Sequence, residues 1–428
     1  MWLFTAAKVP LLLSGASTFG AFCDFSLFWA RLPVFRLRSA ELQGRGGKKQ
    51  RRPNRQPGGA FLCQSFLPLS EPHYHTIIIG AGQAGLAAAY YLQQGGHDCL
   101  LLDANDRVGD SWRQRWEGLR LFSPQKYNAL PGLLPPGDDL HLPSRLEIAD
   151  YLEDYAHHFA FNVSSSSTCV RAQKEADDRW AITTDKGATH HARHLVVATG
   201  AYHTPWKPAA IADSFPADIS QYHSSEIRDV AAIAGPDTDA LVVGAGASGQ
   251  QLSGRLLDAG ASVTLAGPDV PNLPRNFLGQ DIYWWLYNSG LMTLRTDRFP
   301  GKLMVQQGAG DVTVAEPPLP AAIRRIKTEI ARYADGQLRC NGEKKGPDPI
   351  PWPAAGKRGL LVWCTGYRNK YPFLPTEMLV EDGSPLMTDA HSSVYPEVSF
   401  IGLPNLRRPN SSLIGGVGRD AALLNPTD

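Results

Sequence analysis

The sequence predicts an α/β protein with two parallel-sheet domains, and two observations lead to this expectation. The chain has 428 residues, more than one ordinary hydrophobic core contains. A pattern of apolar strand, glycine turn, helix and second strand occurs twice, near residues 75 and 239. Such a crossover joins parallel neighbours in one sheet and is almost always right-handed. We therefore expect two parallel sheets with helices on their faces.

The first copy of the pattern is HTIIIGAGQAGLAAAYYLQQGGHDCLLLD, which begins at His75. Gly80 permits a tight turn, Gly82 lets the backbone approach a pyrophosphate, and Gly85 lets the helix pack closely on the strand. The helix N-terminus then faces the phosphate charge. The second strand ends at Asp103, which is placed to accept hydrogen bonds from ribose hydroxyls. This order of elements predicts a Rossmann-like dinucleotide site that includes these four residues.

The second copy is DALVVGAGASGQQLSGRLLDAGASVTLAG, with Gly244, Gly246 and Gly249 in the turn. The strand predicted at 262–266 has no Asp or Glu at its end. An acid there would repel a 2′-phosphate, so its absence favours NADPH, with NADH as the alternative. Arg275 follows nearby and either supplies positive charge for that phosphate or is an ordinary surface residue.

Charge and cysteine usage exclude several classes of protein. Residues 1–72 carry ten Lys and Arg against three acids, a net of +7, so the total of +1 leaves −6 for residues 73–428. The body therefore has no basic surplus for binding nucleic acid. The six cysteines form no CxxC pair, which argues against a zinc site and against a local redox dithiol. Scattered free thiols are typical of a reducing compartment, and we expect a cytoplasmic protein.

Residues 1–72 form an N-terminal extension with several interpretations. Val9–Ala30 is apolar apart from Asp24 and is followed by arginines, so residues 1–38 contain the one stretch expected to associate with a membrane. A transit peptide is a further interpretation, because acids are scarce. The charged stretch GRGGKKQRRPNRQPGG is expected to be disordered. Alternatively, translation begins near Leu69, and residues 1–68 are then not part of the protein.

Two local patterns predict packing. Ser144 and Glu147 have the spacing of a capping box, which opens a helix with Leu146, Ile148, Tyr151, Leu152, Tyr155 and Phe159 on one side. Tyr283, Trp284, Trp285 and Tyr287 form a dense aromatic cluster. We expect this cluster to pack at a domain interface rather than to line a substrate site.

Several segments between Tyr74 and Leu424 resemble one family in order. They are RVGDSWRQRWEGLRLFSPQKYNALPG (Arg107–Gly132), LPSRLEIADYLEDYAHHF, HLVVATGAYHTPWKP, LPRNFLGQDIYWWL, LLVWCTGYR and FIGLPNLRRPNSSLIGGVGRDAA. Together with the two glycine turns, they resemble the flavin-containing monooxygenases, the single-component FAD/NADPH enzymes, and most closely their bacterial-type branch.

The resemblance implies FAD at the first glycine turn and a nicotinamide nucleotide at the second. It places Trp112 and Gly416 at the flavin side, where the glycines of 415–418 either open a helix towards the flavin ring or form an ordinary loop. Gly200 and Gly366 follow apolar strands, so their turns lie beside the crevice in which ligands bind. The implied organisation is an FAD domain at 73–207, resumed at 346–428, with an NAD(P)H domain at 208–345 inserted between.

The implied reaction is reduction of FAD by NADPH, addition of molecular oxygen to give a peroxyflavin, and oxygen transfer to a small molecule. The substrate would be a nitrogen or sulfur nucleophile or a carbonyl compound. The cofactor carries this chemistry, so we assign no catalytic residue and expect no metal.

Two departures from the family pattern leave alternatives open. The linker fingerprint has Phe215 and His223, but Ala217 replaces its glycine and Ile227 its aromatic residue, which argues against the Baeyer–Villiger subgroup. We interpret His223 as a linker residue rather than a base. Phe122 stands where the family often has an Asn beside the oxygenated flavin. This favours, as a first alternative, an NAD(P)H-dependent flavin oxidase or reductase that releases peroxide or passes electrons to a partner. A second alternative is a degenerate nucleotide-binding module at a membrane.

Overall fold

The structure is a computed structural model that describes residues 73–306, 313–315, 319–341 and 349–424. Every described residue belongs to one compact unit. The interpretations of the N-terminal extension, Val9–Ala30 included, lie outside the described residues. Within the described ranges, no helix is both long and apolar enough to cross a membrane.

The first sheet has nine strands, in the order β21-β22-β23-β6-β1-β2-β3, with β5 paired to β6 and β4 to β5. Its centre is parallel, since β1 pairs with β2 and β6, β2 with β3, and β6 with β23 in parallel. Its strands are β1 (His73–Ile79), β2 (Cys99–Leu102), β3 (Val163–Ser164), β4 (Cys169–Lys174), β5 (Trp180–Thr184), β6 (Thr189–Val197), β21 (Met387–Thr388), β22 (His391–Ser392) and β23 (Val398–Phe400). The inner strands are runs of fully buried residues because helices or loops cover both faces.

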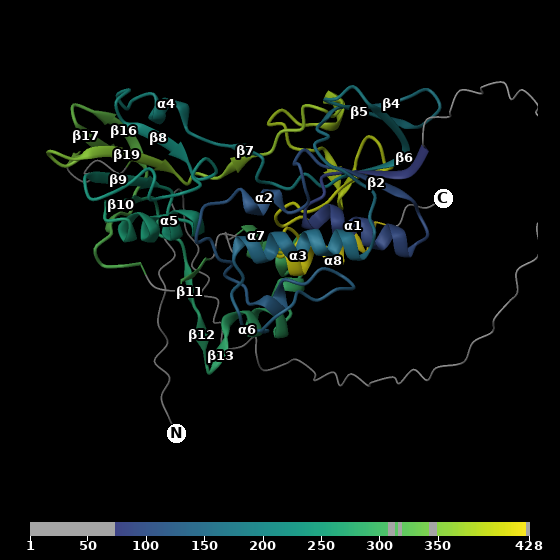
Figure 1. The fold of residues 1–428 in the computed structure, drawn as a ribbon, viewed down its shortest axis with the longest axis horizontal. Helices are drawn as coiled ribbons and strands as arrows, with labels where there is room; N and C mark the ends of the chain where they lie inside the picture. Colours follow the sequence, from purple (N-terminus) through teal and green to yellow (C-terminus); the bar gives the residue numbers. More distant parts are fainter. Residues whose placement is uncertain (1–72, 307–312, 316–318, 342–348, 425–428) are drawn as a thin grey trace, which may run out of the picture. The chain divides into compact units, whose positions relative to one another are not determined.

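Helices α1 (Gln83–Gln94), α3 (Arg145–His158) and α8 (Ile414–Ala421) share one hydrophobic core on this sheet, and α2 (Asp110–Arg113) contacts α3 (Figure 1). The predicted capping box of α3 is confirmed. The Glu147 amide donates to Ser144 Oγ at 3.3 Å, and the Ser144 amide donates to Glu147 Oε2 at 2.7 Å. The predicted apolar face is buried at Ile148 and Tyr155, but its first member, Leu146, is 47% exposed. Leu146 lies in the first turn, at the edge of the buried stripe.

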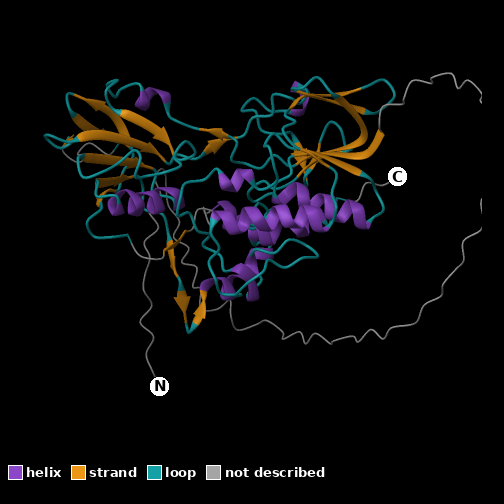
Figure 2. Cartoon of the chain, viewed as in Figure 1, coloured by secondary structure: helices purple, strands orange, loops and turns teal. Residues whose placement is uncertain are grey.

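The second sheet has five strands, all parallel, in the order β15-β10-β9-β19-β8. They are β8 (Ser220–His223), β9 (Thr238–Val243), β10 (Ser262–Ala266), β15 (Arg324–Ile326) and β19 (Arg358–Trp363), and α5 (Ala247–Asp258) packs against β9 and β10. Figure 2 shows the two sheets as separate groups of strands. The predicted fold class, two Rossmann-like domains with one inserted into the other, is therefore confirmed.

The position of β19 differs from the expected organisation, in which the first domain resumes at residue 346. β19 is hydrogen-bonded between β9 and β8, so the second sheet continues to Trp363. An apolar strand pairs equally well with any buried parallel neighbour, and its sequence does not record which sheet it joins. The short strands β7 (Thr204–Pro205) and β20 (Tyr367–Arg368) pair with each other. We propose that the chain passes between the domains at this pair, near 204 and 367.

A long crossover connects β10 to β15. Its elements are β11 (Asn272–Pro274), β12 (Asn276–Phe277), β13 (Gln280–Asp281), α6 (Ile282–Asn288), the 3-10 turn Leu291–Thr293, α7 (Gly301–Gln306) and β14 (Thr313–Ala315). The crossover reaches the first sheet's side, where the Thr296 amide donates to the Arg407 carbonyl at 2.9 Å. The remaining elements are α4 (Ala209–Ala212), β16 (Ile330–Ala334), β17 (Gln337–Cys340), β18 (Ile350–Pro351) and the 3-10 turns Gln125–Tyr127 and Thr376–Met378.

Candidate functional site

The three glycines of the first turn are needed for different reasons. Gly80 has φ of +104°, and a Cβ there would lie 2.6 Å from the Ala198 carbonyl oxygen. A Cβ on Gly85 would lie 1.8 Å from the Gly80 oxygen, so these two positions exclude a side chain by backbone alone. Gly82 has an ordinary extended conformation, φ −79° and ψ −171°, and nothing lies within 4 Å of the Cβ it lacks. Its missing side chain leaves open space at the start of α1, which fits the approach of a phosphate.

Asp103 stabilises this turn by accepting hydrogen bonds from backbone amides. Its side chain is buried, with Oδ2 accepting the Ala81 amide at 2.6 Å and Oδ1 accepting the Asn105 amide at 2.8 Å. The Asn105 side-chain amide also donates to Oδ1 at 2.8 Å. A carboxylate has about four lone-pair sites, so three bonds leave one site for a ribose hydroxyl. That predicted role stays a prediction, whereas holding the turn is a role that the sequence pattern did not indicate.

Three segments meet at the first turn of α1. Trp112 Nε1 donates to Gln83 Oε1 at 3.3 Å, and Gln83 Nε2 donates to the Ser412 carbonyl at 3.2 Å. Gln83 therefore joins α2 to the loop before α8. Sequence reasoning identified Trp112 but missed Gln83, because the fingerprint leaves that position unspecified.

The glycines of α8 are explained by close packing. A Cβ on Gly415 would lie 1.9 Å from the Tyr127 carbonyl oxygen, and one on Gly416 would lie 2.0 Å from the Asn410 oxygen. The helix expected at this glycine cluster is present, beginning at Ile414. Gly416 is buried, so its backbone packs on Asn410, and its predicted cofactor contact stays a prediction.

Gly200 and Gly366 lie in the turns after β6 and β19. Both have positive φ, +73° and +81°, and neither has an atom within 4 Å of its missing Cβ. Glycine is therefore favoured at each by backbone conformation, and the space beside each remains open. Both turns stand at the carboxyl ends of parallel strands, where ligands of such sheets bind.

The second glycine turn repeats the geometry of the first. Gly244 has φ of +107°, and its Cβ would lie 2.3 Å from the Cys364 carbonyl oxygen. A Cβ on Gly249 would lie 1.8 Å from the Gly244 oxygen, while nothing lies within 4 Å of the Cβ missing from Gly246. The open position is again the N-cap residue of a nucleotide-fold helix, here α5.

Positive charge at the end of β10 comes from the neighbouring strand β15. Arg325 donates to the Leu265 carbonyl at 2.6 Å and to Asp269 Oδ1 at 3.2 Å, and Lys327 pairs with Asp269 at 2.9 Å. Lys327 and then Arg325 lower the pKa of Asp269. The sequence could not indicate these residues, because only the sheet order brings β15 beside β10.

The Arg275 side chain contacts other parts of the protein. Its Nε lies 2.7 Å from Asp281 Oδ2, and its guanidinium donates to the Phe122 carbonyl. Only 11% of the Arg275 side chain is exposed. Arg275 therefore connects the long crossover to the loop that precedes Tyr127. Its burial differs from that of an ordinary surface residue, and its predicted contact with a phosphate stays a prediction.

The aromatic cluster packs against that same loop. Tyr127 stacks on Tyr287 with centroids 4.7 Å apart and on Tyr283 at 5.9 Å. Burial raises the pKa of Tyr283 to about 12, so its hydroxyl is protonated at neutral pH. Since the Tyr127 carbonyl touches Gly415, this aromatic cluster of α6 also lies close to the first turn of α8.

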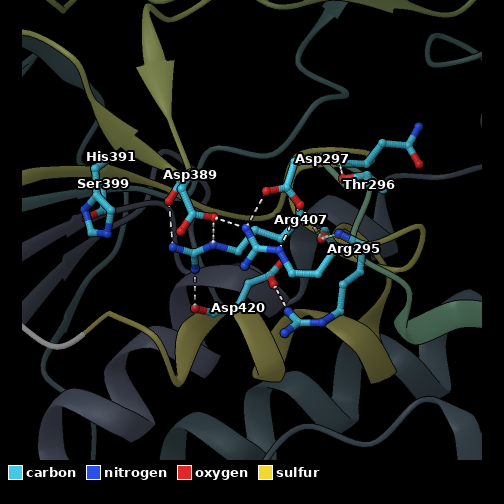
Figure 3. Close-up of polar contacts among 11 residues, drawn as sticks. Arg295, Thr296, Asp297, Asp389, His391, Ser399, Arg407 and Asp420 are labelled. Atoms are coloured by element: carbon cyan, nitrogen blue, oxygen red, sulfur yellow. Dashed lines mark hydrogen bonds and ion pairs between the residues drawn. The ribbon is translucent and has the colours of Figure 1, made fainter. Parts of the chain in front are cut away.

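A polar cluster connects the loop that precedes α8 with the long crossover (Figure 3). Arg407 is 3% exposed, and its Nε and Nη2 donate to Asp389 Oδ1 at 2.8 Å and to the Asp389 carbonyl at 2.6 Å. Arg295 donates to the same carboxylate at 2.9 Å, and Arg408 pairs with Asp420 of α8. Burial opposes ionisation of Asp389, but Arg407 and Arg295 outweigh it and lower its pKa. The cluster is structural, because its members pair with one another.

His223 is the last residue of β8 and lies beside the turn that precedes β20. It is fully buried, with Nε2 3.0 Å from the Gly366 carbonyl and Nδ1 2.8 Å from Ser225 Oγ. Because a carbonyl only accepts, Nε2 carries the proton and Nδ1 accepts. Burial lowers the pKa of His223, which keeps it neutral. These contacts agree with its interpretation as a linker residue.

The chain resembles several known proteins. The family described as pyridine nucleotide-disulphide oxidoreductase matches residues 77–276. An uncharacterised CzcO-like oxidoreductase of Geobacillus kaustophilus is 31% identical over 352 residues, which are 82% of this chain and 96% of that protein. The indole-3-pyruvate monooxygenase YUCCA6 of Arabidopsis thaliana is 31% identical over 214 residues, 48% of this chain and 51% of its own length.

Among solved structures, the flavin-containing monooxygenase from Stenotrophomonas maltophilia shares the fold. Its TM-score is 0.61 at 22% identity, with 82% of this chain and 96% of that chain covered. The two nucleotide folds and these relatives define a two-dinucleotide flavoprotein oxidoreductase. The chain belongs to the flavin-containing monooxygenase family. It is an oxidoreductase, and its family implies the use of FAD and NADPH.

Proposed function

We propose that this enzyme consumes NADPH and transfers one atom of molecular oxygen to a small nitrogen- or sulfur-containing or carbonyl substrate. The proposal rests on a glycine-turn geometry that is present in both nucleotide folds. Gly82 and Gly246 each begin a nucleotide-fold helix with open space in place of a side chain. Two such turns accommodate two dinucleotides, FAD at the first and NADPH at the second. Bound FAD supplies hydride acceptance and the chemistry with oxygen.

The chain's own contribution at the first turn is binding and orientation. The N-terminus of α1 directs backbone donors at the position of the pyrophosphate, and Asp103 holds that turn in shape through the Ala81 amide. Gln83 and Trp112 hold the neighbouring segments together. The start of α8 adds the partial positive charge of a helix N-terminus near Leu413, which is 41% exposed.

Arg325 and Lys327 support NADPH as the preferred donor of hydride. Both are cationic and stand at the carboxyl end of β10, where a 2′-phosphate would lie in such a fold. We expect Arg325→Ala to lower kcat/KM for NADPH about 10-fold or more, the value of a hydrogen bond to a charged group, while kcat/KM for NADH changes little. Lys357→Ala is the matched control, since Lys357 bonds Ser262 at the opposite end of the strand. Equal losses with both nucleotides would contradict this assignment.

The aromatic cluster guides the choice of substrates. Tyr127, Tyr283 and Tyr287 present partly exposed rings close to the first turn of α8. The plant relative YUCCA6 is named for an aromatic keto acid, indole-3-pyruvate. We therefore place aryl sulfides, aromatic amines and aromatic keto acids first in a substrate screen.

A flavin oxidase that releases peroxide is the second candidate, and Phe122 is the observation that favours it. A phenyl ring provides no hydrogen bond where the family often has an amide. The test is anaerobic reduction of the FAD-loaded protein, residues 71–428, by NADPH, followed by oxygen and candidate substrates. Oxygenated product in a ratio near one to the NADPH consumed would support the monooxygenase. Stoichiometric hydrogen peroxide with every substrate would support the oxidase, and no reduction by NADPH or NADH would contradict both.

A further inference from the structure

The segment 112–120, which begins in α2, touches the first helix of each nucleotide fold. At its start, Trp112 donates to Gln83 in the first turn of α1 at 3.3 Å. Trp116, only four residues further on, is 3% exposed. It belongs to the hydrophobic cluster of the second sheet, together with Ile227 and with Leu252 and Leu256 of α5. A residue that precedes the inserted domain in the chain therefore completes the core of that domain.

Polar contacts hold the rest of the segment along α5. The Glu117 amide donates to the Arg228 carbonyl at 2.8 Å, and Gln251 Nε2 donates to the Arg120 carbonyl at 3.2 Å. Gly118 has φ of +79°, and a Cβ there would lie 2.8 Å from the Arg255 guanidinium. The two contacts with α5, at Gln251 and Arg255, lie about one turn apart, and Leu252 and Leu256 of the Trp116 cluster lie in the same part of the helix. In Figure 1, α2 appears between α1 and α5.

A second contact ties the same segment to the point where the chain passes between the domains. Arg115 Nη1 donates to the Tyr367 hydroxyl at 2.8 Å, and Tyr367 lies in β20. The Trp116 indole N–H is buried and has no hydrogen-bond partner among the described residues. Apolar packing alone therefore holds the Trp116 ring, so Phe would retain most of its contacts and Ala would lose them.

We propose that segment 112–120 positions the two nucleotide sites relative to each other, with Trp116 as its anchor. This inference rests on the proposed function. Hydride transfer requires reacting atoms about 3–3.5 Å apart, and a displacement of 1 Å costs about 100-fold in rate. FAD and NADPH would be held by different sheets, and the chain joins those sheets through β7 and β20, strands of 2 residues each. The segment supplies a further connection, between α1 and α5, in addition to the contacts that the long crossover makes with the first sheet's side.

The test compares Trp116→Ala with Trp116→Phe in FAD-loaded protein. The Ala variant should slow flavin reduction at saturating NADPH by about 10- to 100-fold, with the Kd for NADP⁺ unchanged within a factor of about two, because no nucleotide contact is lost. Trp116→Phe should restore the rate. Leu360→Ala is the control for damage to the core, since Leu360 is fully buried in the same cluster but comes from β19. It should leave the reduction rate near that of the wild type.

Two further readouts separate positioning from stability and from the proposed function. In apoprotein, amide hydrogen exchange at residues 115–120 should speed up in Trp116→Ala and not in Leu360→Ala. Tyr367→Phe removes the Arg115 contact without opening a cavity and should slow reduction by a few-fold, which keeps the test available if Trp116→Ala does not fold. Wild-type reduction rates in both Trp116→Ala and Tyr367→Phe, or an equal loss in Leu360→Ala, would overturn the positioning role alone. Failure of NADPH to reduce the wild type would overturn the proposed function and this role with it.

Discussion

Replacing Gly82 by Ala should weaken FAD binding while leaving the apoprotein about as stable as before. The new Cβ meets no protein atom within 4 Å, and φ of −79° suits any residue. Loss of glycine's freedom in the unfolded chain stabilises by about 0.4–1 kcal/mol, and Ala is a poorer N-cap than Gly by about 0.5–1 kcal/mol. These two contributions to the free energy of unfolding nearly cancel. The apoprotein Tm should therefore change by less than about 3 °C.

The same Cβ occupies the space that a pyrophosphate needs. Loss of one hydrogen bond to a charged group costs about 1.5–3 kcal/mol, which weakens FAD binding about 10- to 100-fold. Gly85→Ala should behave in the opposite way, because its Cβ would lie 1.8 Å from the Gly80 oxygen. Such an overlap forces backbone shifts, and the cost of about 1–3 kcal/mol or more lowers the Tm of the apoprotein itself.

Two measurements on each variant check this contrast. Quenching of flavin fluorescence on titration gives the Kd for FAD, and thermal unfolding followed by tryptophan fluorescence gives the apoprotein Tm. Gly246→Ala is the matched control, since its geometry is the same but lies in the second fold. It should keep the Kd for FAD and raise KM for NADPH. A Gly82→Ala protein that binds FAD as tightly as the wild type, or loses as much Tm as Gly85→Ala, would refute the reasoning.

The remaining predictions concern stability. Burial lowers the pKa of His223 in the folded state below 6.5. As the pH falls, the unfolded chain therefore takes up the proton before the folded protein does. The stability that is present above pH 6.5 is lost as the pH falls towards the folded-state pKa. The Tm should therefore fall between pH 7 and 5, less steeply in His223→Gln, and an unchanged slope in that variant would be evidence against this. Arg407→Met should cost about 1.5–3 kcal/mol in urea unfolding, because it removes charged hydrogen bonds from a buried guanidinium. Asp297→Ala, which breaks an ion pair with an exposed carboxylate, should cost less than about 1 kcal/mol, and equal costs would disprove the distinction. Ser144→Ala should cost about 1 kcal/mol by removing a helix cap; an unchanged urea midpoint would contradict it.

The nucleotide turns were predictable because their constraints are local. Gly80 is favoured by its own positive φ, and Gly85 is required by the Gly80 oxygen five residues before it, and these requirements impose a fixed spacing on the sequence. The capping box at Ser144 was predictable for the same reason, since both of its hydrogen bonds span three residues. Gln83 and Arg325 were missed because their partners, Ser412 and Leu265, are distant in sequence. Trp116 was missed because its partners lie in another domain.

The sequence by itself determined the two nucleotide folds, their order along the chain and the family to which the enzyme belongs. Each depends on motifs in which neighbouring residues satisfy one another. Only the tertiary structure decided that β19 joins the second sheet, that Arg325 stands at the end of β10, and that Trp116 packs on α5. These are pairings between distant segments. Buried strands and apolar side chains fit many partners equally well, so the choice among them is made only when the whole core packs.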